Sequence, residues 1–299
     1  MIIFFIFFLF LIYILSNFAF ENIILSPRKS KIDAFDLLEK RGLYSNYKFK
    51  ESALEEIEIL SHDKFKLKSY FAKNDSYSDK VILIIHGYTA NHYISLQFID
   101  FYLNNGFNIL LIDSRSHGNS EGKYATYGIK EREDIKLWIR TLKDKLGNNI
   151  KIGIHGQSMG ASTALMYGGK YKDIDFIIAD CPYSSGKDIL KYQFKHIVKI
   201  TPYPLYQLVN VLFKIRCKFS MNSVNPSSDI LNLNIPILFI HGKEDKIIPY
   251  YMSKNMYKLR NNKYDKIFIV DHADHVESYM YNKTQYENII IKFLNEVYI

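Results

Sequence analysis

Short and nearly continuous apolar runs recur along the chain from residue 80 onward. Runs of this kind are typical of strands that are buried on both faces of a parallel sheet. Two earlier segments, ALEEIEIL (53–60) and FKLKSYF (65–71), alternate apolar and polar positions, which predicts antiparallel edge strands. The buried runs are KVILIIHG (80–87), FNILLIDS (107–114), IKIGIHG (150–156), DFIIADCP (175–182), IPILFIHG (235–242) and KIFIVDH (266–272).

Segments with helical periodicity separate these strands. Because strand and helix alternate in chain order, the sequence predicts an α/β fold with a mostly parallel, doubly wound sheet. Trp138 falls on the inner face of one of the helices and is predicted to belong to the core. The helical segments are ISLQFIDFYLNN (94–105), IKEREDIKLWIRTLKDKL (129–146), MGASTALMYGG (159–169), YYMSKNMYKLR (250–260) and TQYENIIIKFLNEV (284–297).

A long insertion interrupts this alternation between the strand ending at Asp180 and the strand that starts near Ile237. It is too long for a simple connection and contains two helical segments, so a lid is predicted at about residues 184–228. One lid helix is predicted to carry a basic stripe, which is either a solvated face or a contact for anionic lipid headgroups. The stripe consists of Lys187, Lys191, Lys195 and Lys199.

The first twenty residues, MIIFFIFFLFLIYILSNFAF, contain no charged side chain. As a helix they would be about 30 Å long, which matches the core of a bilayer. No basic residue precedes the run and no A-x-A-like site follows it, so an uncleaved membrane anchor over residues 1–20 is favoured over a cleaved signal peptide. Residues 21–50 are interpreted as a linker with a short amphipathic helix, and 51–299 as the globular domain. Basic residues just after the anchor favour a cytoplasmic catalytic domain; they are Arg28, Lys29 and Lys31.

Charge and cysteine content add little to this picture. The 299 residues carry a net charge of +8, but lysines are interleaved with acidic residues along the whole chain, so nucleic-acid binding is not expected. Cys181 ends an apolar strand and is interpreted as a small buried hydrophobe, with a disulfide to Cys217 as the alternative. No spacing of His, Cys and Asp indicates a metal site, and no cofactor is expected.

The segment KIGIHGQSMGASTALMYGG (151–169) carries the strongest candidate chemistry. A strand leads into Gly-Gln-Ser-Met-Gly and the chain leaves in a helix. Gly156 and Gly160 flank Ser158, as expected for a turn too tight for side chains that exposes one hydroxyl at its tip. The motif alone is also compatible with an ordinary glycine-rich connection, so its neighbours must decide.

Two further polar residues follow predicted strand ends, Asp245 in FIHGKEDKIIP and His275 in VDHADHVES. The chain order of serine, acid and histidine is that of a nucleophile-elbow hydrolase. We therefore predict Ser158 as nucleophile, His275 as the base and Asp245 as the acid that orients it. The backbone N–H groups of Tyr88, in IIHGYTAN, and Met159 are predicted to form an oxyanion hole.

Several other residues compete for these roles or lie near them. His272 is an alternative base, Glu244 is an alternative acid, and Asp271 and Asp274 are interpreted as loop carboxylates. The loop DSRSHGNSEG (113–122) is expected to fold over the floor of the site through local hydrogen bonds, with His117 as a weaker candidate for substrate contact. Three histidines that precede glycines at strand ends are interpreted as packing residues: His86, His155 and His241.

Five segments, HGYTAN, DSRSHGNSEG, GQSMGAS, HGKEDKIIP and ADHVES, give the chain a resemblance to the α/β-hydrolase superfamily over roughly residues 51–299. More narrowly it resembles the membrane-anchored bacterial hydrolases known as YqkD-like, with a lid of similar length. The resemblance implies the same roles for Ser158, Asp245, His275, Tyr88 and Met159. Gln157 departs from the superfamily, which often has histidine there, but that position tolerates exchange.

The expected function is a carboxylesterase-like serine hydrolase (EC 3.1.1) that forms an acyl-enzyme on Ser158. A peptidase or a thioesterase with the same three residues is the first alternative. The alternative of another class is a catalytically silent, membrane-tethered interaction module. The expected partners are a small-molecule acyl ester and, through the anchor, membrane lipid, with the basic lid helix as a second candidate contact for lipid.

Overall fold

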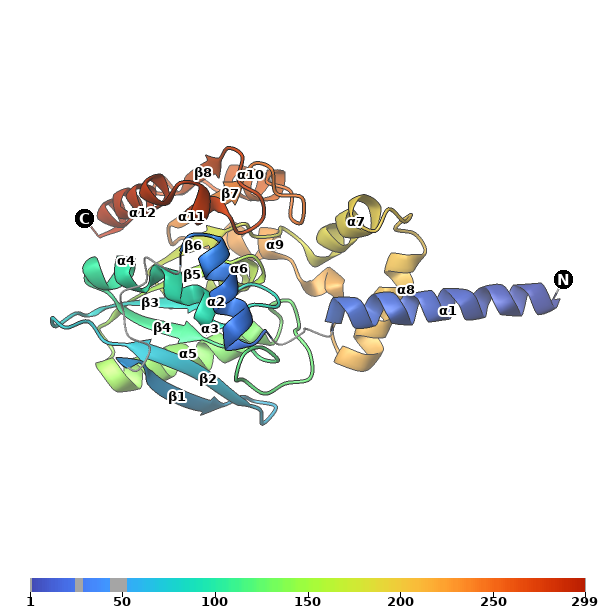
Figure 1. Ribbon diagram of the computed structural model, residues 1–299, viewed down its shortest axis with the longest axis horizontal. Helices are drawn as coiled ribbons and strands as arrows, with labels where there is room; N and C mark the ends of the chain where they lie inside the picture. Colours follow the sequence, from blue (N-terminus) through green and yellow to red (C-terminus); the bar gives the residue numbers. More distant parts are fainter. Residues whose placement is uncertain (1, 25–28, 44–52, 299) are drawn as a thin grey trace.

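Eight strands form one mixed sheet through the centre of the molecule (Figure 1). The computed structural model describes residues 2–24, 29–43 and 53–298, without the side chains of residues 2–9 and 24. The strand order is β1-β2-β4-β3-β5-β6-β7-β8; β2 is antiparallel to β1 and β4, and the remaining pairs are parallel. The bounds are β1 Glu55–Leu60, β2 Lys66–Ala72, β3 Lys80–Ile85, β4 Asn108–Ile112, β5 Lys151–Gln157, β6 Phe176–Asp180, β7 Ile237–Gly242 and β8 Lys266–Val270.

Helices cover both faces of this sheet. Because β3 to β7 are buried on both faces, their sequences are almost continuously apolar, as a parallel sheet between two helical layers requires. The arrangement confirms the predicted α/β class. One face packs against α5 Glu131–Leu146, α6 Met159–Tyr171 and α10 Tyr251–Lys258, and the other against α2 Lys31–Lys40, α4 Ile99–Asn104, α11 Ser278–Tyr281 and α12 Lys283–Val297, with α3 His92–Ser95 just before α4.

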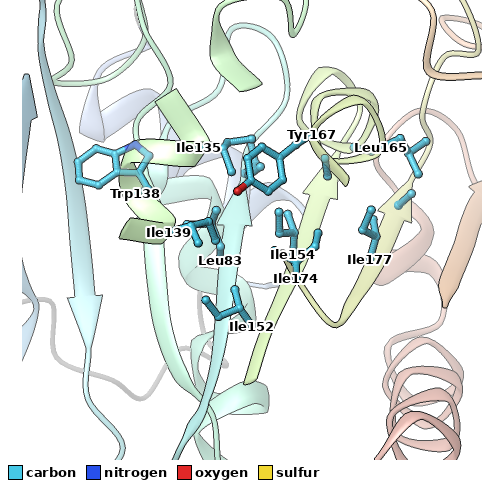
Figure 2. Packing of buried hydrophobic residues seen from close by; sticks show 14 of the residues in the cluster. Leu83, Ile135, Trp138, Ile139, Ile152, Ile154, Leu165, Tyr167, Ile174 and Ile177 are labelled. Atoms are coloured by element: carbon cyan, nitrogen blue, oxygen red, sulfur yellow. The ribbon is translucent and has the colours of Figure 1, made fainter. Parts of the chain in front are cut away.

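The larger core cluster lies between the sheet and helices α5 and α6 (Figure 2). Trp138 of α5 is 1% exposed and packs in this cluster with Leu83 of β3 and Ile154 of β5, which confirms its predicted core position. The helix begins with acidic side chains and ends at Gly147, whose φ of 98° suits glycine. Burying each large apolar side chain contributes about 1.5–3 kcal/mol, so this layer holds the strand that leads to Ser158 firmly in place.

The predicted insertion lies between β6 and β7. Helix α7 begins behind Ser185, whose hydroxyl accepts a hydrogen bond from the N–H of Asp188, and it ends at His196. The prediction that four lysines share one helix is therefore wrong for the last of them, because Lys199 lies beyond the end of α7. The ammonium group of Lys191 contacts the hydroxyl and the ring of Tyr203. The bounds are α7 Gly186–His196, α8 Leu205–Leu212 and α9 Pro226–Asp229.

In the described part of the chain, two helices precede β1. Helix α1, Ile2–Ile24, runs beside α8 and extends past it at its N-terminal end (Figure 1). Within the part of the chain whose side chains are described, no helix is long and apolar enough to cross a membrane. The expected anchor over residues 1–20 falls partly outside that part, and membrane attachment is not confirmed. Helix α2 buries Ala34 and Leu38, and Leu38 joins the core cluster on its face of the sheet. Arg41, just after the helix, donates a 3.1 Å hydrogen bond from Nη1 to the carbonyl oxygen of Val276.

Candidate active site

The turn between β5 and α6 carries Ser158 in a conformation that few residues adopt. Its φ and ψ are 54° and −117°, which places it at the tip of a sharp strand-to-helix turn. The two flanking positions need glycine for the tight turn and also because neighbouring backbone atoms leave no space for a Cβ atom. A Cβ atom on Gly156 would lie 2.4 Å from the carbonyl oxygen of Gly160, and one on Gly160 would lie 2.2 Å from that of Ile85.

The close contacts around Gly160 predict that one added methyl group would strongly reduce the free energy of unfolding. Because the obstructing atoms are backbone carbonyls of β3 and its following residue, they cannot rotate away as a side chain could. Gly160→Ala should lower the free energy of unfolding by about 1–3 kcal/mol in urea titrations. Asp144→Ala, at an exposed position of α5, should change it by no more than about 0.5 kcal/mol. Equal unfolding midpoints for Gly160→Ala and the wild type would contradict the tight packing of α6 on β3.

The structure brings Ser158, His275 and Asp245 into one hydrogen-bonded row. Nδ1 of His275 lies 2.7 Å from Oδ2 of Asp245, and Nε2 lies 2.9 Å from Oγ of Ser158. An ionised carboxylate only accepts, so Nδ1 carries the proton and Nε2 is free to accept the hydroxyl hydrogen of Ser158. The side chains come from the ends of β5, β7 and β8, which meet at one edge of the parallel sheet.

The Asp245 carboxylate is held by four donors. Its Oδ1 accepts the backbone N–H groups of Ile247 and Ile248 at 2.9 and 2.8 Å, and its Oδ2 accepts from both His275 and His241. Burial alone would raise the pKa of this carboxyl, but the hydrogen bonds from the two histidines outweigh it and lower the pKa to about 2. The residue is therefore a fixed negative charge beneath the imidazole of His275.

Sequence analysis assigned His241 to packing, whereas the structure places it against Asp245. Nε2 of His241 faces two acceptors, Oδ2 of Asp245 at 3.1 Å and the carbonyl oxygen of Ile248 at 2.8 Å, so it must carry a proton. Nδ1 then accepts from the hydroxyl of Ser253, at 2.7 Å. No local sequence signal separates this histidine from the others that end strands; only the register of β7 against the loop at Asp245 reveals its role.

A cavity of about 320 Å³ opens at Ser158. Its wall includes Tyr88 and Met159, the two residues predicted to supply oxyanion donors. Gly87 brings the loop after β3 close to Ser158, because a Cβ atom there would lie 3.1 Å from Cβ of Ser158. Met159 is the first residue of α6, where a backbone N–H has no partner within the helix. The wall also contains residues that sequence analysis did not anticipate: Asn22, Ile23, Tyr127, Tyr183 and Gln193.

The competing residues lie elsewhere. Asp271 pairs with Lys243 at 2.7 Å, and Asp274 accepts the backbone N–H of His275, so both are loop carboxylates as interpreted. Among the residues that the structure describes, neither His272 nor Glu244 lies in the wall of the cavity or in the hydrogen-bonded row of Ser158, His275 and Asp245. The three strand-end histidines and the loop histidine are all buried: His86, His117, His155 and His241.

The loop over residues 113–122 is held by local hydrogen bonds, as expected. Asp113 accepts from the backbone N–H and Nδ1 of His92 and from the N–H of Asn119, and its own carbonyl oxygen accepts from the hydroxyl of Ser120. Nδ1 of His117 lies 2.8 Å from the carbonyl oxygen of Arg115, and His117 is absent from the cavity wall. His117 thus belongs to the support of the site, and its absence from the cavity wall lends no support to its candidate role in substrate contact.

Cys181 and Cys217 are both free and buried, which excludes the disulfide. Cys181 is nonetheless close to the site: its sulfur, a carboxylate oxygen of Asp245 and a ring nitrogen of His275 lie within 4.8 Å of one another. Burial raises the pKa of the Cys181 thiol well above its usual value, so the thiolate that a metal would need is disfavoured. His275 is in addition already bonded on both nitrogens.

The comparisons with known proteins agree with this fold. A family model described as the alpha/beta hydrolase fold matches residues 80–221. The uncharacterized protein YqkD of Bacillus subtilis is 34% identical over 218 residues, which cover 72% of this chain and 71% of that protein. The chain belongs to the α/β-hydrolase family. The predicted resemblance to YqkD is thereby confirmed.

Two further relatives place this α/β hydrolase among known proteins. The uncharacterized membrane protein YNL320W of Saccharomyces cerevisiae is 25% identical over 243 residues, covering 81% of this chain and 80% of that protein. The esterase Pf2001 of Pyrococcus furiosus superposes with a TM-score of 0.67 at 26% identity, covering 84% of this chain and 94% of the esterase. The α/β hydrolase described here is thus similar to an esterase over nearly all of that enzyme's length.

Proposed function

We propose that this α/β hydrolase is a serine hydrolase of carboxylic esters that works through an acyl-enzyme on Ser158. The observation that carries the proposal is the hydrogen-bonded row from Ser158 through His275 to Asp245, at 2.9 and 2.7 Å. A serine hydroxyl is a poor nucleophile until a base accepts its proton, and this row supplies that base in the required tautomer.

Each chemical step is assigned to a group beside Ser158. Nε2 of His275 accepts the proton as Oγ of Ser158 attacks the ester carbonyl, and the backbone N–H groups of Tyr88 and Met159 stabilise the oxyanion that forms. The intermediate expels the alkoxide, which takes the proton from His275 and leaves as an alcohol. A water molecule then attacks the acyl-serine, with His275 again as base, and releases the carboxylic acid and Ser158. The fixed charge of Asp245 stabilises the imidazolium in both halves.

The proposal predicts a covalent label on one serine. A fluorophosphonate is attacked by an activated serine and loses fluoride, so the native protein should gain one phosphonyl group, and peptide mass spectrometry should locate it on Ser158. The heat-denatured chain should not react, because the hydroxyl is then an ordinary alcohol. A variant at an exposed serine, Ser76→Ala, serves as the control and should be labelled at the wild-type rate. Native protein that stays unlabelled would contradict an activated Ser158 and favour a catalytically silent module.

Ester, thioester and amide substrates all form the same acyl-enzyme and differ in the leaving group. A panel of matched acyl esters, thioesters and aminoacyl amides therefore distinguishes the esterase from the thioesterase and peptidase alternatives, by comparison of kcat/KM within one acyl group.

A further inference from the structure

A second cavity adjoins the one at Ser158. It measures about 540 Å³ and shares Asn22 and Ile23 of α1 in its wall with the first cavity. Both volumes fall in the range of about 300–1,000 Å³ that is usual for small-molecule sites. The second cavity lies between α1 and the lid, and its wall is almost entirely apolar. Representative wall residues are Leu15 and Ala19 of α1 and Phe194, Val198, Ile200 and Leu205 of the lid.

Helix α1 is fixed to the lid by specific contacts near this cavity. Phe20 is 4% exposed and packs edge-on against Phe213, with ring centroids 5.2 Å apart. The guanidinium of Arg216 lies over the Phe20 ring and donates a 2.6 Å hydrogen bond to the side-chain oxygen of Asn17. These contacts hold the C-terminal half of α1 as one wall of the cavity rather than as a loose neighbour.

The end of α1 is also fixed to the catalytic cavity. The hydroxyl of Tyr127 donates a 2.6 Å hydrogen bond to the carbonyl oxygen of Ile23, and both residues line the cavity at Ser158. The side of α1 that faces the lid therefore lines both cavities, from the cavity at Ser158 to the second cavity.

We propose that this second cavity, here called the acyl groove, binds the hydrocarbon chain of the ester substrate, with α1 and the lid as its two walls. The inference rests on the proposed function, because the chain must be attached to a carbonyl at Ser158. An acyl chain is the occupant that fits, since it is polar only at the end that reaches Ser158 and apolar along the part that would lie between α1 and the lid. Helix α1 is then part of the substrate site.

The test compares kcat/KM of the full chain for p-nitrophenyl acetate, butyrate, octanoate and dodecanoate, with detergent held constant and esters below their micelle concentrations. Each methylene that enters the groove should raise kcat/KM by up to about fourfold until the groove is filled. Ala19→Trp and Val198→Trp narrow the groove from α1 and from the lid, and each should lower the ratio of dodecanoate to acetate kcat/KM at least tenfold. Ile14→Trp, on the same helix but at an exposed position outside the groove wall, should keep the wild-type ratio.

A wild-type rate that does not rise with chain length would overturn the acyl groove, even where acetate hydrolysis depends on Ser158. Wild-type ratios in both tryptophan variants would overturn it as well. Because Val198 is about half exposed, a larger side chain there fits the fold even if Ala19→Trp does not fold.

Binding separates a failure of the groove from a failure of the proposed reaction. Cis-parinaric acid, a fluorescent fatty acid, should bind the Ser158→Ala chain, and adding Ala19→Trp or Val198→Trp should weaken that binding at least tenfold relative to Ile14→Trp. If the wild-type chain does not hydrolyse p-nitrophenyl acetate but the variants show these differences in fatty-acid binding, the proposed esterase activity is refuted and the acyl groove remains supported. Equal binding by all three double variants would overturn the groove independently of any activity.

Discussion

Ser158→Ala should lower kcat for p-nitrophenyl butyrate by about a millionfold, as loss of the nucleophile does in other serine hydrolases. The effect is this large because His275 and Asp245 act only through the hydroxyl that the substitution removes. The methyl group of alanine fits the turn, since the strained backbone of Ser158 is fixed by its neighbours and its N–H donates a 2.8 Å hydrogen bond to the carbonyl oxygen of Asp180. The measurement is steady-state hydrolysis, with thermal unfolding to show that the variant is folded.

The matched control for this variant is Ser76→Ala, which removes a hydroxyl from an exposed loop. It should leave kcat and KM unchanged. More than a tenth of the wild-type kcat in Ser158→Ala would rule out the acyl-enzyme on this serine, because no other serine lies in the wall of the catalytic cavity among the described residues.

Asp245→Asn should lower kcat about ten-thousandfold while leaving the fold intact. Oδ2 of the carboxylate accepts hydrogen bonds from His275 and His241, while Oδ1 accepts two backbone N–H groups. The side-chain amide of asparagine has only one oxygen that can accept, so its NH₂ group must take one of these two places. With an N–H turned toward it, His275 would carry its proton on the nitrogen that faces Ser158 and could no longer act as base. Asp75→Asn, in an exposed loop, is the control and should retain wild-type kcat.

The substitution Asp245→Asn should also change how the free energy of unfolding depends on pH below about pH 4. The folded pKa of Asp245 is about 2, below the ordinary value of 3.8, so its carboxylate stabilises the fold above about pH 4, and that contribution is lost as the pH falls toward 2. The difference in unfolding free energy between the wild type and Asp245→Asn should therefore shrink over this range. A difference that stays constant from pH 5 to pH 2 would contradict the lowered pKa.

Sequence analysis could predict the sheet and the sharp turn at Ser158 because each depends on local pattern. Strands β3 to β8 are short isoleucine-rich runs, and the turn at Ser158 needs its two glycines for steric reasons that the sequence displays directly. The helix predicted over residues 94–105 was less accurate: α3 ends at Ser95, a 3₁₀ turn follows over Leu96–Phe98, and α4 begins at Ile99.

Contacts between distant segments could not be predicted in this way. His241 resembles the other strand-end histidines in sequence, and its position against Asp245 depends on how the loop after β7 folds back. The role of α1 was missed for a related reason. A uniformly apolar segment has no periodicity that marks a packed face, so the contact of Phe20 with Phe213 has no signal in the sequence.

The hydrogen bond from Arg41 to the carbonyl oxygen of Val276 ties the segment before the first strand to the loop that carries His275. Burial lowers the pKa of Arg41 from its usual value, which shows how far this guanidinium is withdrawn from water. In evolutionary terms, we expect the segment around Arg41 and the loop that carries His275 to change together, because a change in the length of either segment would displace a partner of this hydrogen bond. Divergence in the segment around Arg41 among homologues would then be expected to accompany divergence in the loop that carries His275.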